Sequence, residues 1–247
     1  MSIQVANKFS DYYEKWMRQL EDDLKILLLV SRDRHQETGY EAIVNKFTAH
    51  HKELYMIKWA LAHEDVLAFF NPVWLSPLEN AYLWITGWKP SMAFRLVDTL
   101  RKAERQSAGS LHGMTDDQLK MVEDLRVKIG VEEERVEREM ERQQVSVADR
   151  KMVELVKLEI QAKKNGGVEA VEKVNELVEL ALKGMLEGLE KVMKMADCVR
   201  LKTLKGVLDV LTPRQCVDLL AAMSMLQIQT RKWGIKKESL VMCDDRW

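Results

Sequence analysis

The chain has 247 residues, 47% of them hydrophobic, which is enough apolar material for a sizeable core in one domain or two closely packed ones. Its 38 basic and 39 acidic residues nearly cancel, so the basic excess of a dedicated nucleic-acid binder is missing. Three cysteines without close spacing argue against a disulfide framework and against a zinc site. No signal peptide and no membrane-spanning apolar run are evident, so we expect a protein of the cytoplasm or the nucleus.

Few helix breakers interrupt the sequence, with four prolines and eleven glycines in the whole chain. This predicts an all-α fold, a multi-helix bundle of long amphipathic helices. The first helix is expected over residues 5–30, because its apolar residues recur every three or four positions, and a polar loop follows at 32–39. A second helix is expected over 40–70, where Asn71-Pro72 ends it.

A short helix with strong boundary signals is predicted next. Ser76 and Glu79 have the spacing of a capping box, and Pro77 occupies the first helical position. Gly87 is predicted to end this helix with a positive φ, and Pro90 to open the following helix. A loop at 105–114, which contains Gly and Ser, is the candidate mobile linker.

The second half of the chain carries two more start signals. Thr115 with Gln118 forms a capping box before a long helix, and Thr212 with Gln215 repeats the pattern around Pro213. Ser146 is expected to cap a helix over 147–164, which Asn165-Gly166-Gly167 ends, and Asp197 to cap another after a helix that begins near 168. The last helix is expected to end near 233–234 and to leave a tail at 235–247. The expected domain is 5–234, with two halves, 5–104 and 115–234, as an alternative.

A search for chemistry finds no positive case for an enzyme. The five histidines have no metal-ligand spacing, and no phosphate-binding loop or nucleophile elbow is present. We therefore expect no catalytic residue, no metal and no cofactor. The charge-dense stretch 132–142 reads as a solvated helix face or as an acidic partner-binding stripe. The basic stretch 191–205 reads as a solvated face or as a calmodulin-binding or membrane-surface segment.

The tryptophans near the short helix are the candidates for recognition. Trp74 and Trp88 are expected to flank the helix and Trp84 to lie within it, which makes Trp84 the better candidate for the core. Trp and Arg are frequent interface hot spots, so Trp74, Trp88 and Arg95 are predicted to bind a partner protein. The alternative is that all three only hold the helix junction together.

Several ordered motifs resemble the delay-of-germination domain of plants, which also forms the C-terminal part of TGA-type bZIP transcription factors. The most specific are Trp74-Leu75-Ser76-Pro77-Leu78-Glu79 and Trp84-Ile85-Thr86-Gly87-Trp88-Lys89-Pro90-Ser91. Further matches lie at residues 9–16, 115–119, 196–204, 211–215 and 231–234. The chain resembles a stand-alone form of the domain, because it lacks the basic region and leucine heptads with which a bZIP protein grips DNA.

The resemblance implies a regulator of seed dormancy, abscisic acid or stress responses. It implies partners such as protein phosphatases of abscisic acid signalling or transcription co-regulators. Direct DNA binding is not expected, because the basic region is missing, and membrane association is not expected, because no apolar run is long enough to span a bilayer. Some members of the family bind haem, and the resemblance implies histidines of the last helix as its ligands. Residues 213–234 contain no histidine here, which argues against haem.

Three functional hypotheses stay open at this point. The leading one is a helical module that acts by protein–protein interaction, with a second copy of the chain among the partners left open. The second is a DNA-associated transcription regulator that acts alone or with bZIP proteins. The third is a small-ligand or haem sensor.

Overall fold

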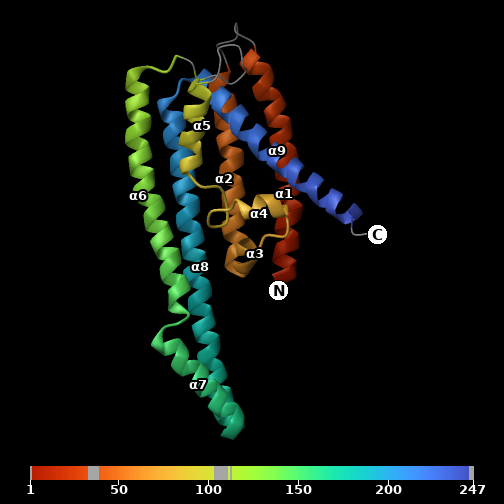
Figure 1. Cartoon of the computed structure of the whole chain (residues 1–247), viewed down its shortest axis with the longest axis vertical. Helices are drawn as coiled ribbons and strands as arrows, with labels where there is room; N and C mark the ends of the chain where they lie inside the picture. Colours follow the sequence, from red (N-terminus) through yellow and green to blue (C-terminus); the bar gives the residue numbers. More distant parts are fainter. Residues whose placement is uncertain (1, 33–38, 103–110, 112, 245–247) are drawn as a thin grey trace.

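The computed structural model describes residues 2–32, 39–102, 111 and 113–244, and every regular element in those ranges is a helix (Figure 1). The all-α prediction is therefore confirmed. The elements are α1 (Ser2–Arg32), α2 (Tyr40–Glu64), α3 (Leu67–Phe70), α4 (Pro77–Ala81), α5 (Ser91–Lys102), α6 (Asp116–Ser146), α7 (Arg150–Asn165), α8 (Val168–Val210) and α9 (Pro213–Asp244).

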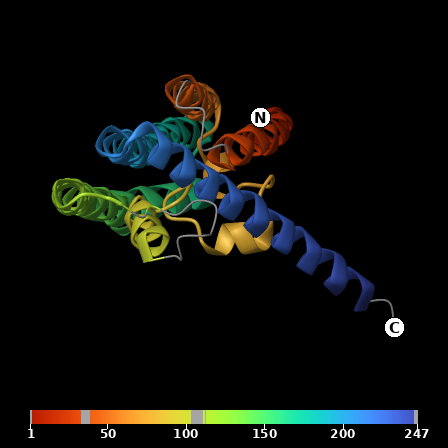
Figure 2. The same cartoon turned by 90° about the horizontal axis from the view of Figure 1, so that it is seen from above.

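The long helices form a bundle, and one part of it projects. α6 lies along α8, and α1 packs on α2 and on α9, which crosses the bundle obliquely (Figures 1 and 2). At one end α7 folds back on the first half of α8, and this two-helix hairpin extends beyond the body (Figure 1). We call residues 150–186 the projecting hairpin. The buried residues of α8 begin only at Val192, where the helix enters the body.

Two hydrophobic clusters fill the body. The first joins α1, α2 and α3 to α8 and α9, and its largest side chains include Phe9, Trp16, Phe47 and Phe69. The second joins α5 and α6 to the same two long helices, α8 and α9. Because α8 and α9 contribute to both clusters, they connect the two proposed halves, 5–104 and 115–234. The division into halves stays a prediction.

Two of the predicted capping boxes are present and linked to each other. The hydroxyl of Thr115 accepts from the backbone N–H of Gln118 at 3.1 Å, and that of Thr212 accepts from Gln215 at 3.3 Å. In each box the side-chain oxygen of the glutamine accepts a hydrogen bond from the backbone N–H of the threonine. The Gln118 amide also donates to Gln215 Oε1 at 2.9 Å, so the start of α6 is tied to the start of α9.

Some predicted boundaries were wrong. The helix expected over 40–70 breaks after Glu64, because Asp65 has an extended backbone and its carboxylate accepts from Leu67 N–H. Ser146 ends α6 instead of capping a new helix, and its hydroxyl donates to the carbonyl of Gln143. α7 begins at Arg150, after Asp149. The stop at 165–167 is confirmed.

Two long helices continue where the sequence predicted interruptions. α8 runs through Asp197 without a break, since this carboxylate is buried among tertiary partners and is not used as a cap. α9 continues past Gly234 to Asp244, so 235–244 is helical. Gly234 is a packing position, where an added side-chain carbon would collide with Ser76 of the α4 cap. Most of the predicted linker at 105–114 lies outside the described residues.

Candidate functional site

The segment between α3 and α5 is fixed at its start by the predicted capping box. Ser76 Oγ accepts from Glu79 N–H at 3.3 Å, and Glu79 Oε2 accepts from Ser76 N–H at 2.8 Å. Pro77 occupies the first helical turn. Arg231 of α9 bonds to the carbonyl of Trp74 at 2.8 Å and pairs with Glu79 at 3.5 Å. The start of α4 is therefore anchored to the long C-terminal helix.

The residues after α4 form a tight turn, which corrects two predictions. α4 ends at Ala81, so Trp84 does not lie within a helix, and Gly87 neither ends the helix nor has a positive φ. The left-handed residues are instead Ile85 and Thr86, with φ of 40° and 61°. Trp84 and Gly87 exchange both backbone hydrogen bonds, at 2.7 and 3.2 Å. Two successive positive φ values between such a pair define a type I′ turn.

This turn is strained, because Ile and Thr are poorly suited to left-handed backbone geometry. Such conformations cost about 1–3 kcal/mol each and persist only where surrounding structure holds them. Arg200 of α8 supplies that support: its guanidinium donates to the carbonyls of Trp84, Ile85 and Trp88, the last two at 2.7 Å. The side chain is buried and lies 5.2 Å from the Trp84 ring centre.

The glycine at position 87 is required by this arrangement for a steric reason. A Cβ atom on Gly87 would lie 2.8 Å from Cζ of Arg200, closer than side-chain carbons normally approach. The guanidinium cannot move away without giving up its bonds to the turn carbonyls. Absence of a side chain is thus what permits arginine to reach the backbone.

A second buried cation and one carboxylate complete the cluster. Asp197 accepts from Arg200 Nη1 at 2.5 Å, from Lys58 Nζ at 3.0 Å and from Trp59 Nε1 at 3.0 Å. Lys58 also donates to the carbonyl and the hydroxyl of Thr86, at 3.1 and 2.9 Å. Burial lowers the pKa of Lys58 to about 8, with Asp197 opposing that shift and Arg200 adding to it. We call Lys58, Asp197 and Arg200 the buried charge cluster.

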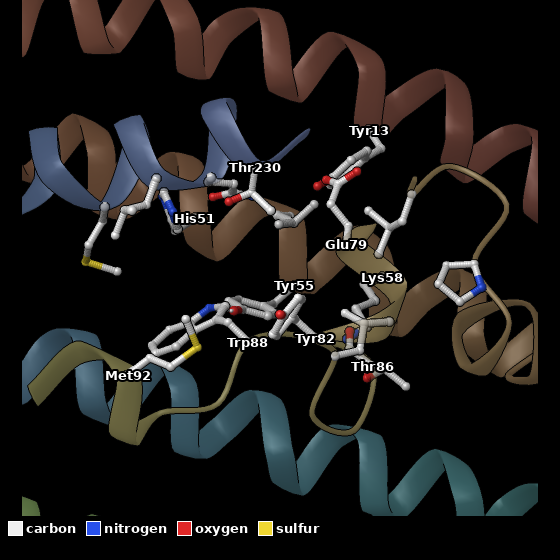
Figure 3. Close-up of a pocket in the computed structure, with 18 of the residues that line it drawn as sticks. Tyr13, His51, Tyr55, Lys58, Glu79, Tyr82, Thr86, Trp88, Met92 and Thr230 are labelled. Carbon is white, nitrogen blue, oxygen red and sulfur yellow. Dashed lines mark hydrogen bonds between the residues drawn. The ribbon is translucent and has the colours of Figure 1, made fainter. Parts of the chain in front are cut away.

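A cavity of about 290 Å³ lies next to this turn (Figure 3). Its wall comes from α1, α2, α9 and the segment 69–96, and most of the lining is aromatic or aliphatic. The polar lining includes Tyr13, His51, Tyr55 and Thr230, together with Lys58, Glu79, Thr86, Ser224 and Gln227. The size falls at the lower end of the range for small-molecule sites, and the mixture of an apolar wall with few polar groups is typical of them.

The polar groups of the cavity are mostly buried and neutral or paired. Trp88 Nε1 donates to the Tyr55 hydroxyl at 3.1 Å. Burial lowers the pKa of His51 to about 4, so its ring is neutral at physiological pH, and raises the pKa of Tyr13 to about 12. Figure 3 shows Tyr55 beside Trp88, and Thr230 on the side formed by α9.

The residues predicted to bind a partner occupy different environments. Trp74 is only 7% exposed and packs on the rings of Phe9 and Phe69 at 4.6 and 5.3 Å. Trp88 is half-buried in the cavity wall, and Arg95 on α5 is exposed. Trp84 is also half-buried and donates from its ring to Glu137 at 2.8 Å. Trp74 and Trp88 therefore both line the cavity, whereas Arg95 lies outside it on the exposed side of α5, and the partner-binding role of all three stays a prediction.

Sequence reasoning did not single out the buried charge cluster. Lys58 falls on the same helical stripe as the apolar Leu54 and Leu61. A single lysine within an apolar stripe was the one feature of the sequence that could have indicated a buried charge. Asp197 and Arg200 stand three apart, which resembles an ordinary surface pair. Only the packing of α2 on α8 shows that these residues meet.

The described part of the chain contains no group of three or more His, Cys, Asp or Glu residues arranged to hold a metal ion. None of its helices is both long and apolar enough to cross a membrane.

The structure is an all-α bundle with a strained, arginine-held turn beside a largely apolar cavity. Residues 17–99, which include α2 to α4 and the turn, match the family model described as DOG1: Seed dormancy control.

Individual relatives are consistent with this match. The chain is 50% identical to Protein DOG1-like 4 of Arabidopsis thaliana over 155 residues, which are 62% of this chain and 64% of that protein. It is 31% identical to Protein ZW2 of Arabidopsis thaliana over 112 residues, 44% and 45% of the two chains. It is 26% identical to Transcription factor TGA2.1 of Oryza sativa subsp. japonica over 149 residues, 60% and 42% of the two chains.

The chain thus spans between about two fifths and two thirds of the length of these relatives. The matches confirm the resemblance to the delay-of-germination domain that the motifs predict, and the weaker resemblance to TGA factors. The match to the family model includes the turn at 84–87, so the most distinctive local geometry of the body lies within the shared segment.

Proposed function

We propose that this chain is a regulatory module of seed dormancy control that acts by binding other proteins and not by catalysis. The similarity to DOG1-like proteins supports the physiological setting. The observation that carries the binding role is the exposed apolar surface of the projecting hairpin. The finer setting that we propose is abscisic acid or stress signalling and the transcriptional control linked to it.

One stripe of α7 is apolar and faces away from α8. Val153, Val156 and Ile160 are each exposed and follow one another by three and four residues, so they share one helical face. The opposite side of α7 carries Ala162, which is buried. A helix that is apolar on two sides and packed on only one is typical of a surface that another chain covers.

The first half of α8 adds further exposed leucines to the projecting hairpin. They are Leu177, Leu180, Leu182 and Leu186. The ion pairs of the hairpin, such as Lys163–Glu159 and Lys173–Glu169, join residues four apart in the same helix. Such pairs keep the hairpin helical and leave the apolar stripes free for a partner.

Partners of the proposed module include protein phosphatases and transcription co-regulators. A dimer, in which a second copy covers the hairpin, is a further arrangement of the same surface. Arg95 remains a proposed contact, because it is exposed on α5, whereas Trp74 lies in the core. Action with transcription co-regulators would take place in the nucleus, and action with phosphatases in the nucleus or the cytoplasm.

The alternative of a DNA-associated regulator rests on the similarity to TGA transcription factors. Its test is binding to random duplex DNA at two salt concentrations. Phosphate contacts make the affinity fall steeply with salt. We expect weak binding, since the acidic and basic residues of the chain nearly cancel.

The proposed binding surface can be tested with two matched double variants. Val156→Lys with Ile160→Lys places two charges on α7, whereas Val127→Lys with Val131→Lys makes the same kind of change four residues apart on α6. The exposed fractions are comparable, 49% and 52% for the first pair and 62% and 59% for the second. Each variant is immobilised, and the proteins that it captures from seed extract are quantified by mass spectrometry.

We expect the α7 variant to lose partners that the wild type and the α6 variant retain, by tenfold or more, as for loss of about 1.4 kcal/mol of binding free energy. Size-exclusion chromatography with light scattering reports in parallel whether the same change dissociates a dimer. Equal capture by all three proteins would remove the hairpin from consideration and leave Arg95 and the 132–142 face of α6 to be tested.

A further inference from the structure

The cavity beside the turn is a built feature of the body and not a local packing fault. Its volume of about 290 Å³ is close to the lower end of the range for small-molecule sites, and most of its wall is aromatic or aliphatic. Its lining includes Tyr82 and Met92, which are 75% and 54% exposed and therefore mark a side on which it is open to solvent.

The wall of the cavity is held by polar bonds behind it. Lys58 fixes Thr86 on one side, the Trp88–Tyr55 bond fixes the adjacent wall, and Arg231 fixes the Trp74 end. These anchors come from α2 and α9, helices that also carry much of the core. The cavity is thus preformed, which lowers the conformational entropy that a ligand must overcome on binding.

The charged groups that face the cavity are already paired. The lysine ammonium has three protons, and Lys58 directs them to Thr86 O, Thr86 Oγ1 and Asp197. Glu79 accepts from Ser76 N–H and Oγ–H and pairs with Arg231. A charged ligand would have to break one of these arrangements or bury its charge without a partner, and either is unfavourable.

Two hydroxyl groups in the cavity wall are available instead. The Tyr55 hydroxyl accepts from Trp88, but its own proton has no acceptor among the hydrogen bonds of the described residues. Thr230 Oγ1 likewise has no partner within the described part of the chain, on the α9 side of the cavity (Figure 3). A hydroxyl is the kind of group that orients a ligand inside an otherwise apolar site.

We propose that this cavity binds a small, uncharged, largely apolar molecule that carries a hydroxyl or carbonyl group, which accepts a hydrogen bond from Tyr55. The aromatic and aliphatic wall takes up the apolar body, and the hydroxyls select its polar end. This inference goes beyond the proposed protein-binding role, because it concerns a separate surface of the body and a different class of ligand. It remains open to test even where the projecting hairpin binds nothing.

The test uses the uncharged fluorescent probe N-phenyl-1-naphthylamine on the full-length protein at pH 7. Its displacement is compared for 1-decanol and decanoate, which share one chain length and differ in charge. We expect saturable probe binding and displacement by 1-decanol, with decanoate weaker by about tenfold or more, because a buried carboxylate would lack a partner. Decanoate that competes as well as decanol would overturn the assignment of an uncharged ligand.

Matched variants locate the binding. Thr230→Trp fills the cavity from α9, and Thr99→Trp places the same side chain on the exposed face of α5. Only the first should abolish probe binding, and equal binding by both variants would show that the probe lies elsewhere. Absence of saturable binding by the wild type would refute the site.

A second variant tests the hydroxyl without filling the cavity. Tyr55→Phe keeps the ring and should weaken 1-decanol by about threefold or more relative to the probe, since one neutral hydrogen bond is lost. Tyr12→Phe, on α1 outside the cavity wall, is the control. Unchanged decanol affinity in Tyr55→Phe would refute the role of this hydroxyl, even where Thr230→Trp fails to fold.

Discussion

The buried charge cluster and the projecting hairpin both contain oppositely charged side chains, but these side chains have different roles in the two regions. In the body, Lys58, Asp197 and Arg200 are all buried and bond to one another and to the turn. On the hairpin, Lys163 with Glu159 and Lys173 with Glu169 are surface pairs within one helix. An exposed helical pair contributes about 0.3–0.5 kcal/mol, whereas removal of one partner from a buried pair destabilises by about 3–5 kcal/mol.

This difference shows that burial, and not the presence of a charge, sets the energetic role of a residue in this chain. The buried charge cluster holds a strained backbone that hydrophobic packing alone would not specify. The hairpin charges form surface ion pairs within single helices and leave apolar stripes exposed. The following predictions test that contrast, from the largest expected effect to the smallest.

Arg200→Met should lower the free energy of unfolding by about 3–5 kcal/mol, because Asp197 loses a buried partner and three carbonyls of the turn region lose their donor. Denaturant unfolding followed by circular dichroism measures the loss. Lys173→Met on the hairpin is the control and should change stability by less than about 0.5 kcal/mol. Similar losses in the two variants would refute the contrast.

Gly87→Val should destabilise by about 1–3 kcal/mol, because the added carbons collide with the Arg200 guanidinium. Gly184→Ala on the hairpin is the opposite case: the position is helical with open space around it, so alanine should stabilise by up to about 1 kcal/mol. Thermal unfolding should show a lower melting temperature for Gly87→Val and a higher one for Gly184→Ala. An unchanged melting temperature for Gly87→Val would show that Arg200 can move freely.

Lys58 should make stability depend on pH above neutrality. Its pKa is lowered to about 8 in the folded chain, against about 10.4 unfolded, so between these values the unfolded state binds more protons. Stability contributed by this group therefore rises from about pH 8 to about pH 10.4. The difference in free energy of unfolding between wild type and Lys58→Met, measured by denaturant unfolding at a series of pH values, should grow over that range.

Val156→Lys with Ile160→Lys should leave the free energy of unfolding within about 0.5 kcal/mol of the wild-type value, because both side chains are exposed and contribute little to the core. Arg95→Ala should likewise change the free energy of unfolding by less than about 0.5 kcal/mol. Trp88→Ala should destabilise more than either, since its ring bonds to Tyr55 in the cavity wall. A large loss in the hairpin variant would show that the stripe packs inside this chain and is not a partner surface.

Haem binding gives a last, negative expectation. Reconstitution with haem should produce no stoichiometric Soret band, since residues 213–234 lack histidine. A band that disappears on His51→Gln would instead place haem in the cavity, where that ring is found.

Local signals in the sequence predicted much of the fold. The capping boxes at Ser76, Thr115 and Thr212 and the stop at 165–167 depend on residues within three or four positions of one another, so the sequence carries them fully. The same reasoning was wrong at Asp197. Aspartate is a frequent N-cap residue, but this one is buried in the core. A local rule cannot tell whether a carboxylate will meet water or a lysine 139 residues away in the chain.

The sequence by itself determined the all-α class, most helix starts and the resemblance to the delay-of-germination domain, because these depend on periodicity, caps and ordered motifs. Only the tertiary structure decided the turn and the cavity. Ile85 and Thr86 have no intrinsic preference for left-handed geometry, and they adopt it because Arg200 and Lys58 arrive from α8 and α2 to bind their carbonyls. Long-range bonds can impose a backbone that local preferences oppose, and no short stretch of sequence contains both partners.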